Sequence, residues 1–198
     1  MLHRLCLQLT LSIIFLATLA APHALAQGRD VGDQPGYIPD AAEERTDPKF
    51  QRQVVFYRSA EPSGTIIVHT SERFLYVVQP GGRALRYGIG VGRQGFQWQG
   101  LLKISRKQEW PDWTPPEEMI QRQPYLPRWM AGGPGNPLGA RALYLGNTVY
   151  RIHGTNQPRT IGTAVSSGCF RLVNPDVIDL YERIPVGTKV IVRQRPEV

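Results

Sequence analysis

From residue 53 onward the chain is a series of short apolar runs separated by glycine, proline and polar residues. Residues 83–91 alternate apolar with other side chains, which is typical of a β-strand packed on one face. The predicted strands are residues 54–57, 65–68, 74–78, 83–91, 101–104, 142–145, 148–152 and 190–192. Pro80-Gly81-Gly82 predicts a hairpin turn between the third and the fourth. The pattern favours a mostly β fold, either an antiparallel sheet or a sandwich.

Composition agrees with a single loop-rich domain. The chain has 198 residues, of which 41% are hydrophobic and 20% charged, and this length suits one domain with its own core. Glycine and proline are abundant, at 20 and 17 residues, but below the share typical of disorder. The net charge of +7 has no lysine- or arginine-rich run behind it. We therefore expect no nucleic-acid partner. The charge suits an anionic cell-wall polymer or membrane surface, or reflects solubility alone.

The first 26 residues have the pattern of a secretory signal peptide. Arg4 precedes a mostly apolar stretch, and Ala24-Leu25-Ala26 offers small residues for cleavage before Gln27. The alternative is an uncleaved membrane anchor, but the stretch is short and interrupted for a span. We expect an exported, periplasmic protein without a stable membrane span after cleavage. It would keep one cysteine, Cys169, and two histidines, His69 and His153.

Three further regions are distinguished by their composition. Residues 27–52 are polar and proline-containing, which predicts a flexible extension before a domain at 53–195. Residues 108–141 hold three tryptophans and many prolines, with a short helix predicted at 117–123. Such a long aromatic loop often covers a binding site. Asn174-Pro175-Asp176 predicts a helix start with Asn174 as N-cap, and the helix should end near Pro185.

The residues that point to chemistry lie between His153 and Arg171. His153 ends an apolar run, and Cys169 follows Ser166-Ser167-Gly168. A histidine base within reach of a cysteine is the standard arrangement for activating a nucleophilic thiol. Gly168 allows close backbone approach, so that successive amides near it can stabilise an oxyanion. Arg171 places a cation near the thiol, where it would lower the thiol pKa or bind a carboxylate.

This ordered set resembles the L,D-transpeptidase catalytic domain, the YkuD-like family. The family pattern is a His-Gly pair followed, after a short gap, by Ser-His-Gly-Cys-x-Arg. The matching residues here are His153-Gly154 and Ser166-Ser167-Gly168-Cys169-Phe170-Arg171. The segments Asn136-Pro137-Leu138-Gly139 and 174–181 also resemble the family, and the likeness covers roughly residues 63–193. It implies a β-sandwich with short helices and the cysteine on a loop before the C-terminal helix and strand.

The resemblance also implies a two-step acyl transfer on peptidoglycan. Cys169 would be the nucleophile and His153 its base, oriented by the carbonyl of Gly154. A tetrapeptide stem would acylate Cys169 with release of D-alanine. An amine of another stem would then give a 3→3 cross-link. An outer-membrane protein as acceptor would be tethered to the wall, and water would make the enzyme an L,D-carboxypeptidase. The family needs neither a metal nor an organic cofactor.

The remaining site residues follow from the same motif. Ser167 stands where the family often has a second histidine, so we expect it to contribute only its backbone amide, beside Gly168 and Gly154. Arg171 is predicted to bind substrate. Ser166 is predicted to support the substrate site through hydrogen bonds, or to be a plain turn serine. Tyr150 and Arg141 match family-like flanks, where they would either line the cleft or serve packing and ion pairing. His69 follows an apolar run and is interpreted as a strand histidine.

Three other classes use related features. Papain-like wall peptidases place the cysteine before the histidine, which is the reverse of the order here. Sortases use Cys, His and Arg at much wider spacing. A non-catalytic wall-binding module on the same fold would not require both Cys169 and His153. Fast alkylation of Cys169 near neutral pH would distinguish a catalytic thiol from a buried structural one.

Overall fold

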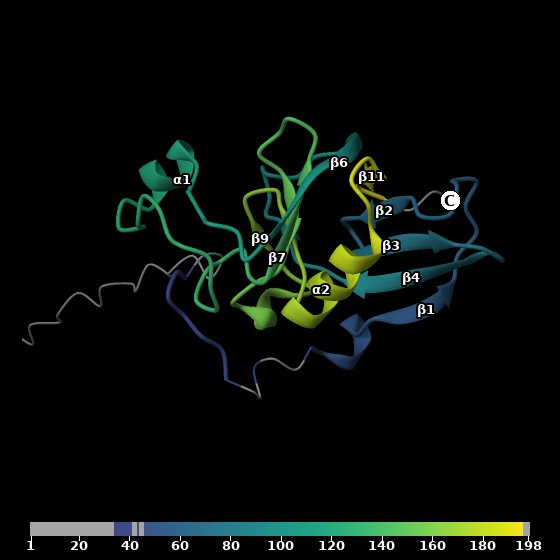
Figure 1. Ribbon diagram of the computed structural model, residues 1–198, viewed down its shortest axis with the longest axis horizontal. Coiled ribbons are helices and arrows are strands. Elements are labelled where there is room, and N and C mark those ends of the chain that lie inside the picture. Colours follow the sequence, from purple (N-terminus) through teal and green to yellow (C-terminus); the bar gives the residue numbers. More distant parts are fainter. Residues whose placement is uncertain (1–33, 41–42, 44–45, 196–198) are drawn as a thin grey trace, which may run out of the picture.

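The computed structural model describes residues 34–40, 43 and 46–195 and has a mostly β architecture (Figure 1). Within these residues the strands are β1 (Gln53–Phe56), β2 (Ile66–His69), β3 (Phe74–Gln79), β4 (Arg83–Gly88), β5 (Val91–Gly92), β6 (Gly100–Glu109), β7 (Arg141–Leu145), β8 (Arg151–His153), β9 (Ala164–Ser166), β10 (Phe170–Arg171) and β11 (Lys189–Arg193). The helices are α1 (Glu117–Arg122) and α2 (Asn174–Arg183), with 3-10 turns at Pro48–Phe50 and Pro158–Thr160. The signal-peptide prediction lies outside the described residues.

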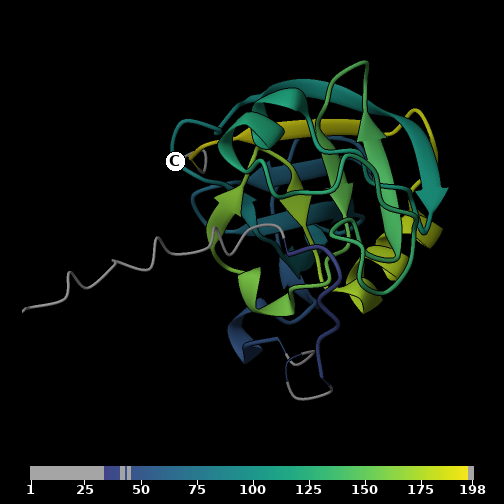
Figure 2. The same ribbon diagram turned by 90° about the vertical axis from the view of Figure 1, so that its left-hand side faces the viewer.

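Nine of the described strands form one sheet in the order β1-β4-β3-β2-β11-β6-β7-β8-β10, and β5 pairs with β9. The long strand β6 belongs to both halves of this sheet, and its register shifts between Ile104 and Arg106. A bulge of this kind bends a strand and increases its twist. In Figure 2, β6 (teal) arches over the molecule beside β11 (yellow). The sheet thus folds over onto itself.

The main core lies between the two halves of the folded sheet. It joins Ile66 and Leu75 of the first half to Leu143, Ile152 and Phe170 of the second, all fully or almost fully buried. Helix α2 covers this core with Val177 and Leu180. The prediction of a mostly β fold with short helices is therefore confirmed.

Most predicted strands are present, with three corrections. The sheet is mixed, because β11 pairs in parallel with β2 and β10 with β8. The predicted strand 83–91 ends at Gly88, since Gly90 bonds to Arg171 and β5 joins a different ladder. The predicted strand 148–152 begins only at Arg151. Thr148 accounts for this difference: its Oγ1 donates to the carbonyl of Leu145 and accepts from the amide of Tyr150, which forms a turn.

Helix α2 begins at Asn174, so the prediction that Asn174 is the N-cap is wrong. Val173 occupies that position, and no side chain caps the helix. The Oδ1 atom of Asn174 instead accepts a hydrogen bond of 2.9 Å from the amide of Ala140. This bond joins the start of β7 to the helix. The amide side chain is therefore used in a tertiary contact rather than a local one.

The loop at residues 110–140 contains a small core of its own. Trp113, Met119, Ile120, Leu126 and Leu138 pack together there, whereas Trp110 and Trp129 are exposed. Asn136 is fully buried and bonds to the carbonyl of Ala131 and the amide of Leu138, which fixes the end of the loop. Figure 1 shows α1 at the tip of this loop, far from α2. The short helix predicted at 117–123 is confirmed.

The outer face of the first half-sheet carries a second, smaller apolar cluster, formed by residues such as Ile67, Phe74 and Tyr76. Phe50, just before β1, covers part of it, and its ring centroid lies 5.5 Å from that of Phe74. The described part of the segment before residue 53 therefore contacts the domain. In the part of the chain that the structure describes, no helix is long and apolar enough to span a membrane.

Candidate active site

The parallel pairing of β8 with β10 brings the histidine next to the segment that follows the cysteine. Ile152 lies opposite Phe170, and His153 opposite Arg171. Because Ile152 and Phe170 both point into the core, alternation along the strands directs His153 and Arg171 to the other face. Cys169 directly precedes β10. Cys169 is thus two residues from Arg171, which lies opposite His153 in the strand pair.

The turn that carries Cys169 is held by Ser166. The hydroxyl of Ser166 donates to the carbonyl of Cys169 at 2.6 Å and accepts from the amide of Gly168 at 3.2 Å. Ser166 is almost fully buried, whereas Cys169 is only partly buried. The amide of Gly168 is thus bonded within the turn, not directed at the cleft as the sequence suggested. The amide of Cys169 is therefore the better candidate oxyanion donor.

Only glycine fits the backbone conformation and the surroundings of residue 168. Its φ angle is +106°, which side chains rarely adopt. A Cβ atom there would lie 2.7 Å from Cε1 of Tyr150. The carbonyl of Gly168 accepts a 2.8 Å hydrogen bond from Nε1 of Trp98. The rings of Trp98 and Tyr150 stack with centroids 4.5 Å apart, and together they form a rigid aromatic wall against the turn.

His153 is buried and neutral at physiological pH. Burial lowers the pKa of His153 to about 3, helped by the positive charges of Arg171 and Arg151 and opposed by the carbonyls of Gly154 and Leu138. Its Nδ1 lies 2.6 Å from the carbonyl oxygen of Gly154. A carbonyl only accepts, so in the neutral ring Nδ1 carries the proton. The lone pair is then on Nε2, the nitrogen that can take a proton from a thiol.

Gly154 orients this histidine, and Arg171 lies opposite it in the strand pair. A Cβ atom on Gly154 would lie 2.4 Å from Oδ1 of Asn174, so helix α2 packs directly on the backbone that orients His153. Arg171 is 3% exposed, and its backbone amide and carbonyl both bond to Gly90. Its guanidinium is therefore a buried positive charge close to His153. Such a charge favours an anion, such as a thiolate or a carboxylate, in its surroundings.

The long loop also contributes a side chain that sequence reasoning missed. Nη2 of Arg122 in α1 lies 3.4 Å from Oγ of Ser167, two residues before Cys169. The guanidinium of Arg122 also lies over the ring of Phe96, with its carbon 4.9 Å from the ring centroid. Arg93 lies over the same ring at 4.5 Å. Two cations thus flank one ring at the edge of the cysteine turn.

Arg141 has partners away from this cluster. Its guanidinium forms a 3.2 Å salt bridge with Glu109 and lies over the ring of Tyr181 in α2. This matches the packing and ion-pairing alternative for Arg141. Tyr150 lies directly against Gly168. Trp98, Arg122, Arg93 and Phe96 were not predicted, because nothing local in the sequence shows that these loop residues meet the cysteine.

Comparison with known proteins identifies the family of the chain. The sequence model of the L,D-transpeptidase catalytic domain, YkuD, matches residues 63–192, a stretch that contains both His153 and Cys169. The chain belongs to this family. It is 39% identical over 140 residues to the probable L,D-transpeptidase ErfK/SrfK of Escherichia coli strain K12. The alignment covers 66% of this chain but only 44% of that relative, so this chain spans less than half of its length.

Two solved structures show the same fold. One, from Brucella melitensis, is described as a probable carnitine operon oxidoreductase. It is 49% identical, covers 78% of this chain and 100% of its own, and has a TM-score of 0.50. An L,D-transpeptidase from Mycobacterium smegmatis has a TM-score of 0.51 at 17% identity, covering 65% of this chain and 58% of its own. The word oxidoreductase describes the Brucella protein. The family of this chain follows from the L,D-transpeptidase domain that it matches.

Proposed function

We propose that this protein is a peptidoglycan L,D-transpeptidase in which Cys169 is the nucleophile and His153 the base. One observation carries the proposal: in a member of this family, a neutral histidine with Nδ1 held by a carbonyl lies opposite Arg171, two residues from the partly buried Cys169. Cys169 and His153 form the nucleophile–base pair, and Gly154 orients the base. The expected signal peptide supports a periplasmic location, where stem peptides are within reach.

The reaction proceeds in two steps. Nε2 of His153 takes the thiol proton, while the sulfur attacks the carbonyl carbon of the third residue of a tetrapeptide stem. The bond to D-alanine breaks, and D-alanine leaves with the proton from His153. In the second step an amine attacks the thioester, forms an amide and restores the thiol. Because the pKa of His153 is low, its protonated form is stabilised only while the negatively charged thiolate lies nearby. Proton transfer therefore accompanies the attack of the sulfur.

The cations around the turn select an acidic donor. Stem peptides carry carboxylates, and three cations lie in this region: Arg171 near His153, Arg122 beside Ser167 and Arg93 over Phe96. We assign Arg122 to a substrate carboxylate, because it lies on the loop side of the turn beside Ser167. The rings of Trp98 and Tyr150 also lie against this turn. A charge-assisted pair of this kind gives both affinity and orientation.

Incubation of the chain from residue 27 with purified disaccharide-tetrapeptides tests this function. Release of D-alanine with 3→3 dimers would identify a cross-linking enzyme, and tripeptides alone an L,D-carboxypeptidase. D-alanine released only when an outer-membrane protein is added would identify a tethering enzyme. His153→Gln should lose each of these products. If the unsubstituted protein releases no D-alanine under any of these conditions, the proposed function is wrong.

A further inference from the structure

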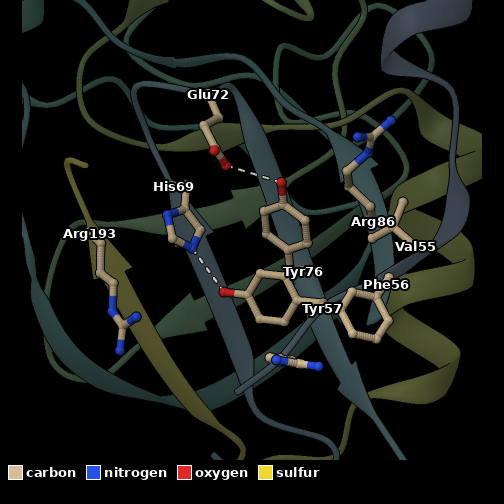
Figure 3. Close-up of a pocket in the computed structure, with 9 residues that line it drawn as sticks. Val55, Phe56, Tyr57, His69, Glu72, Tyr76, Arg86 and Arg193 are labelled. Atoms are coloured by element: carbon tan, nitrogen blue, oxygen red, sulfur yellow. Dashed lines mark hydrogen bonds between the residues drawn. The ribbon is translucent and has the colours of Figure 1, made fainter. Parts of the chain in front are cut away.

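A polar cavity of about 270 Å³ lies on the outer face of the first half-sheet (Figure 3). His69, Tyr76 and Arg86 line it from three neighbouring strands, and Tyr57 and Arg193 from the segments beside them. His69 was interpreted as an ordinary strand histidine. It lies at the end of β2, only 3% exposed, inside a cluster of polar side chains.

This cavity is separate from the cysteine. Along β3, Leu75 and Val77 point into the main core, while Tyr76 belongs to the outer apolar cluster. Along β11, Val190 and Val192 point inward, so alternation directs Arg193 outward. Phe170, next to Cys169, packs in the main core on the inner side of these strands. A ligand in the outer cavity therefore does not touch the catalytic residues.

The centre of the cavity is a rigid group of rings. Tyr57 and Tyr76 stack with centroids 4.6 Å apart, and His69 meets Tyr76 edge-on at 5.4 Å. The hydroxyl of Tyr57 lies 2.9 Å from Nε2 of His69. These contacts fix the three rings before any ligand arrives. Figure 3 shows Arg86 on one side of the two tyrosine rings and Arg193 on the other.

The charge around these rings is predominantly positive. Arg58, Arg86 and Arg193 line the cavity, against a single carboxylate, Glu72. Glu72 accepts a 3.0 Å hydrogen bond from the hydroxyl of Tyr76. Burial, and then the charge of Glu72, raise the pKa of Tyr76 well above its usual value, so Tyr76 adds no negative charge. Three guanidinium groups around one cavity create a positive potential that attracts anions.

Arg86 is held in place with unused donor capacity. Its guanidinium carbon lies 4.1 Å from the ring centroid of Phe74. Its Nε is buried and, among the described residues, has no hydrogen-bond partner. Within the same part of the chain, neither Arg58 nor Arg86 forms a salt bridge with a carboxylate. A buried N–H without a partner costs free energy unless something accepts from it.

We propose that this cavity binds an oxyanionic group, a carboxylate or a phosphate, of an organic ligand. The guanidinium groups supply the charge-assisted hydrogen bonds, and the tyrosine rings pack on the rest of the molecule. A second cavity of about 310 Å³ shares Tyr57, Arg58 and Arg193 with the first. The site therefore has room for a ligand larger than a single ion.

Histidine NMR tests this proposal with a reporter in each site. The chain from residue 27, without a tag, contains only His69 and His153. Ring ¹⁵N signals of His69 report the outer cavity and those of His153 the candidate active site, and the His153→Gln variant assigns them. The probes are glutarate and glycerol phosphate, with glutaramide as the neutral control.

The proposal predicts saturable shifts of the His69 signals with glutarate, with glycerol phosphate or with both, and none with glutaramide. Which anion binds then distinguishes a carboxylate from a phosphate ligand. Arg86→Gln should weaken binding about tenfold or more. Arg83→Gln removes the same charge from the same strand outside the cavity and should change affinity less than about twofold.

No saturable shift with either anion, or equal shifts with glutaramide, would overturn the proposal. So would unchanged affinity in Arg86→Gln. Native His153 signals show that the variant is folded. If Arg86→Gln does not fold, the exposed Arg58→Gln takes its place, with the same expected weakening. The outcome does not depend on the proposed function, because no step at Cys169 is measured.

Discussion

At the scale of single residues, the cysteine turn depends on contacts that leave little freedom. Ser166 closes the turn through two hydrogen bonds, and Gly168, within this turn, lies against the stacked rings of Trp98 and Tyr150. The carbonyl of Gly154 holds His153, and the side chain of Asn174 packs against Gly154. The reacting atoms are therefore positioned by neighbours that are not themselves reactive.

Gly168→Ala should lower both stability and activity. The φ angle of +106° would be strained with a side chain, and the new Cβ would lie 2.7 Å from Tyr150. Gly187→Ala is the matched control, because its φ is +90° and no atom lies within 4 Å of its added Cβ. The control should lose about 1 kcal/mol of unfolding free energy, and Gly168→Ala about 1–3 kcal/mol more. Equal losses by chemical denaturation would show that the contact with Tyr150 is unimportant.

At the scale of elements, the loop that carries α1 connects a surface segment to the site. Arg122 reaches Ser167 from α1, and Asn136 anchors the loop through buried hydrogen bonds. The loop also has its own apolar cluster around Trp113. A side chain on this loop can therefore take part in substrate binding with a defined geometry.

Arg122→Gln should reduce kcat/KM for tetrapeptide substrates about tenfold, because a charge-assisted contact to a substrate carboxylate is lost. Arg128→Gln removes the same charge from the same exposed loop and has no described contact with the cysteine turn. Its kcat/KM should stay within about twofold of the unsubstituted value. Steady-state kinetics on both variants give the comparison. Equal effects would mean that the loop acts only through its overall charge.

The sequence predicted the elements whose signals are local. Strands such as β2 and β3 have long apolar runs, and α1 follows a proline pair. Strands β9 and β10 were missed, because two or three residues contain no periodicity and their partners are fixed only by the folded chain. Asn174 was predicted to cap the helix start. Its side chain instead accepts a bond from Ala140, 34 residues away in the sequence, which no local pattern predicts. The sequence motif identified His153 and Cys169 as site residues. Trp98 and Arg122 were not identified, because only the folded loops bring them to the cysteine turn.

At the scale of the whole molecule, burial of His153 couples the site to stability. The unfolded histidine binds a proton below about pH 6.5, but the folded one only below about pH 3. Its contribution to the unfolding free energy is therefore fully present above pH 6.5 and is lost as the pH falls toward 3. Asp176 acts in the opposite direction, because burial raises its pKa to about 6 and acid then favours the folded state.

Comparison of unfolding at pH 7 and pH 4.5 isolates the histidine. Between these values the unsubstituted protein should lose on the order of 2 kcal/mol more unfolding free energy than His153→Gln. The contribution of Asp176 is common to both proteins and cancels in the difference. Urea denaturation at the two pH values measures it. Parallel changes in the two proteins would mean that His153 is not held neutral by burial.

The most direct test of the central claim is intact-mass analysis of the acyl-enzyme. The chain from residue 27 contains one cysteine, so a thioester has a single possible position. With disaccharide-tetrapeptide, the protein should gain the mass of the substrate minus D-alanine, on the peptide that contains Cys169. Cys169→Ala should gain nothing. An adduct on another residue, or D-alanine release by Cys169→Ala, would contradict Cys169 as the nucleophile.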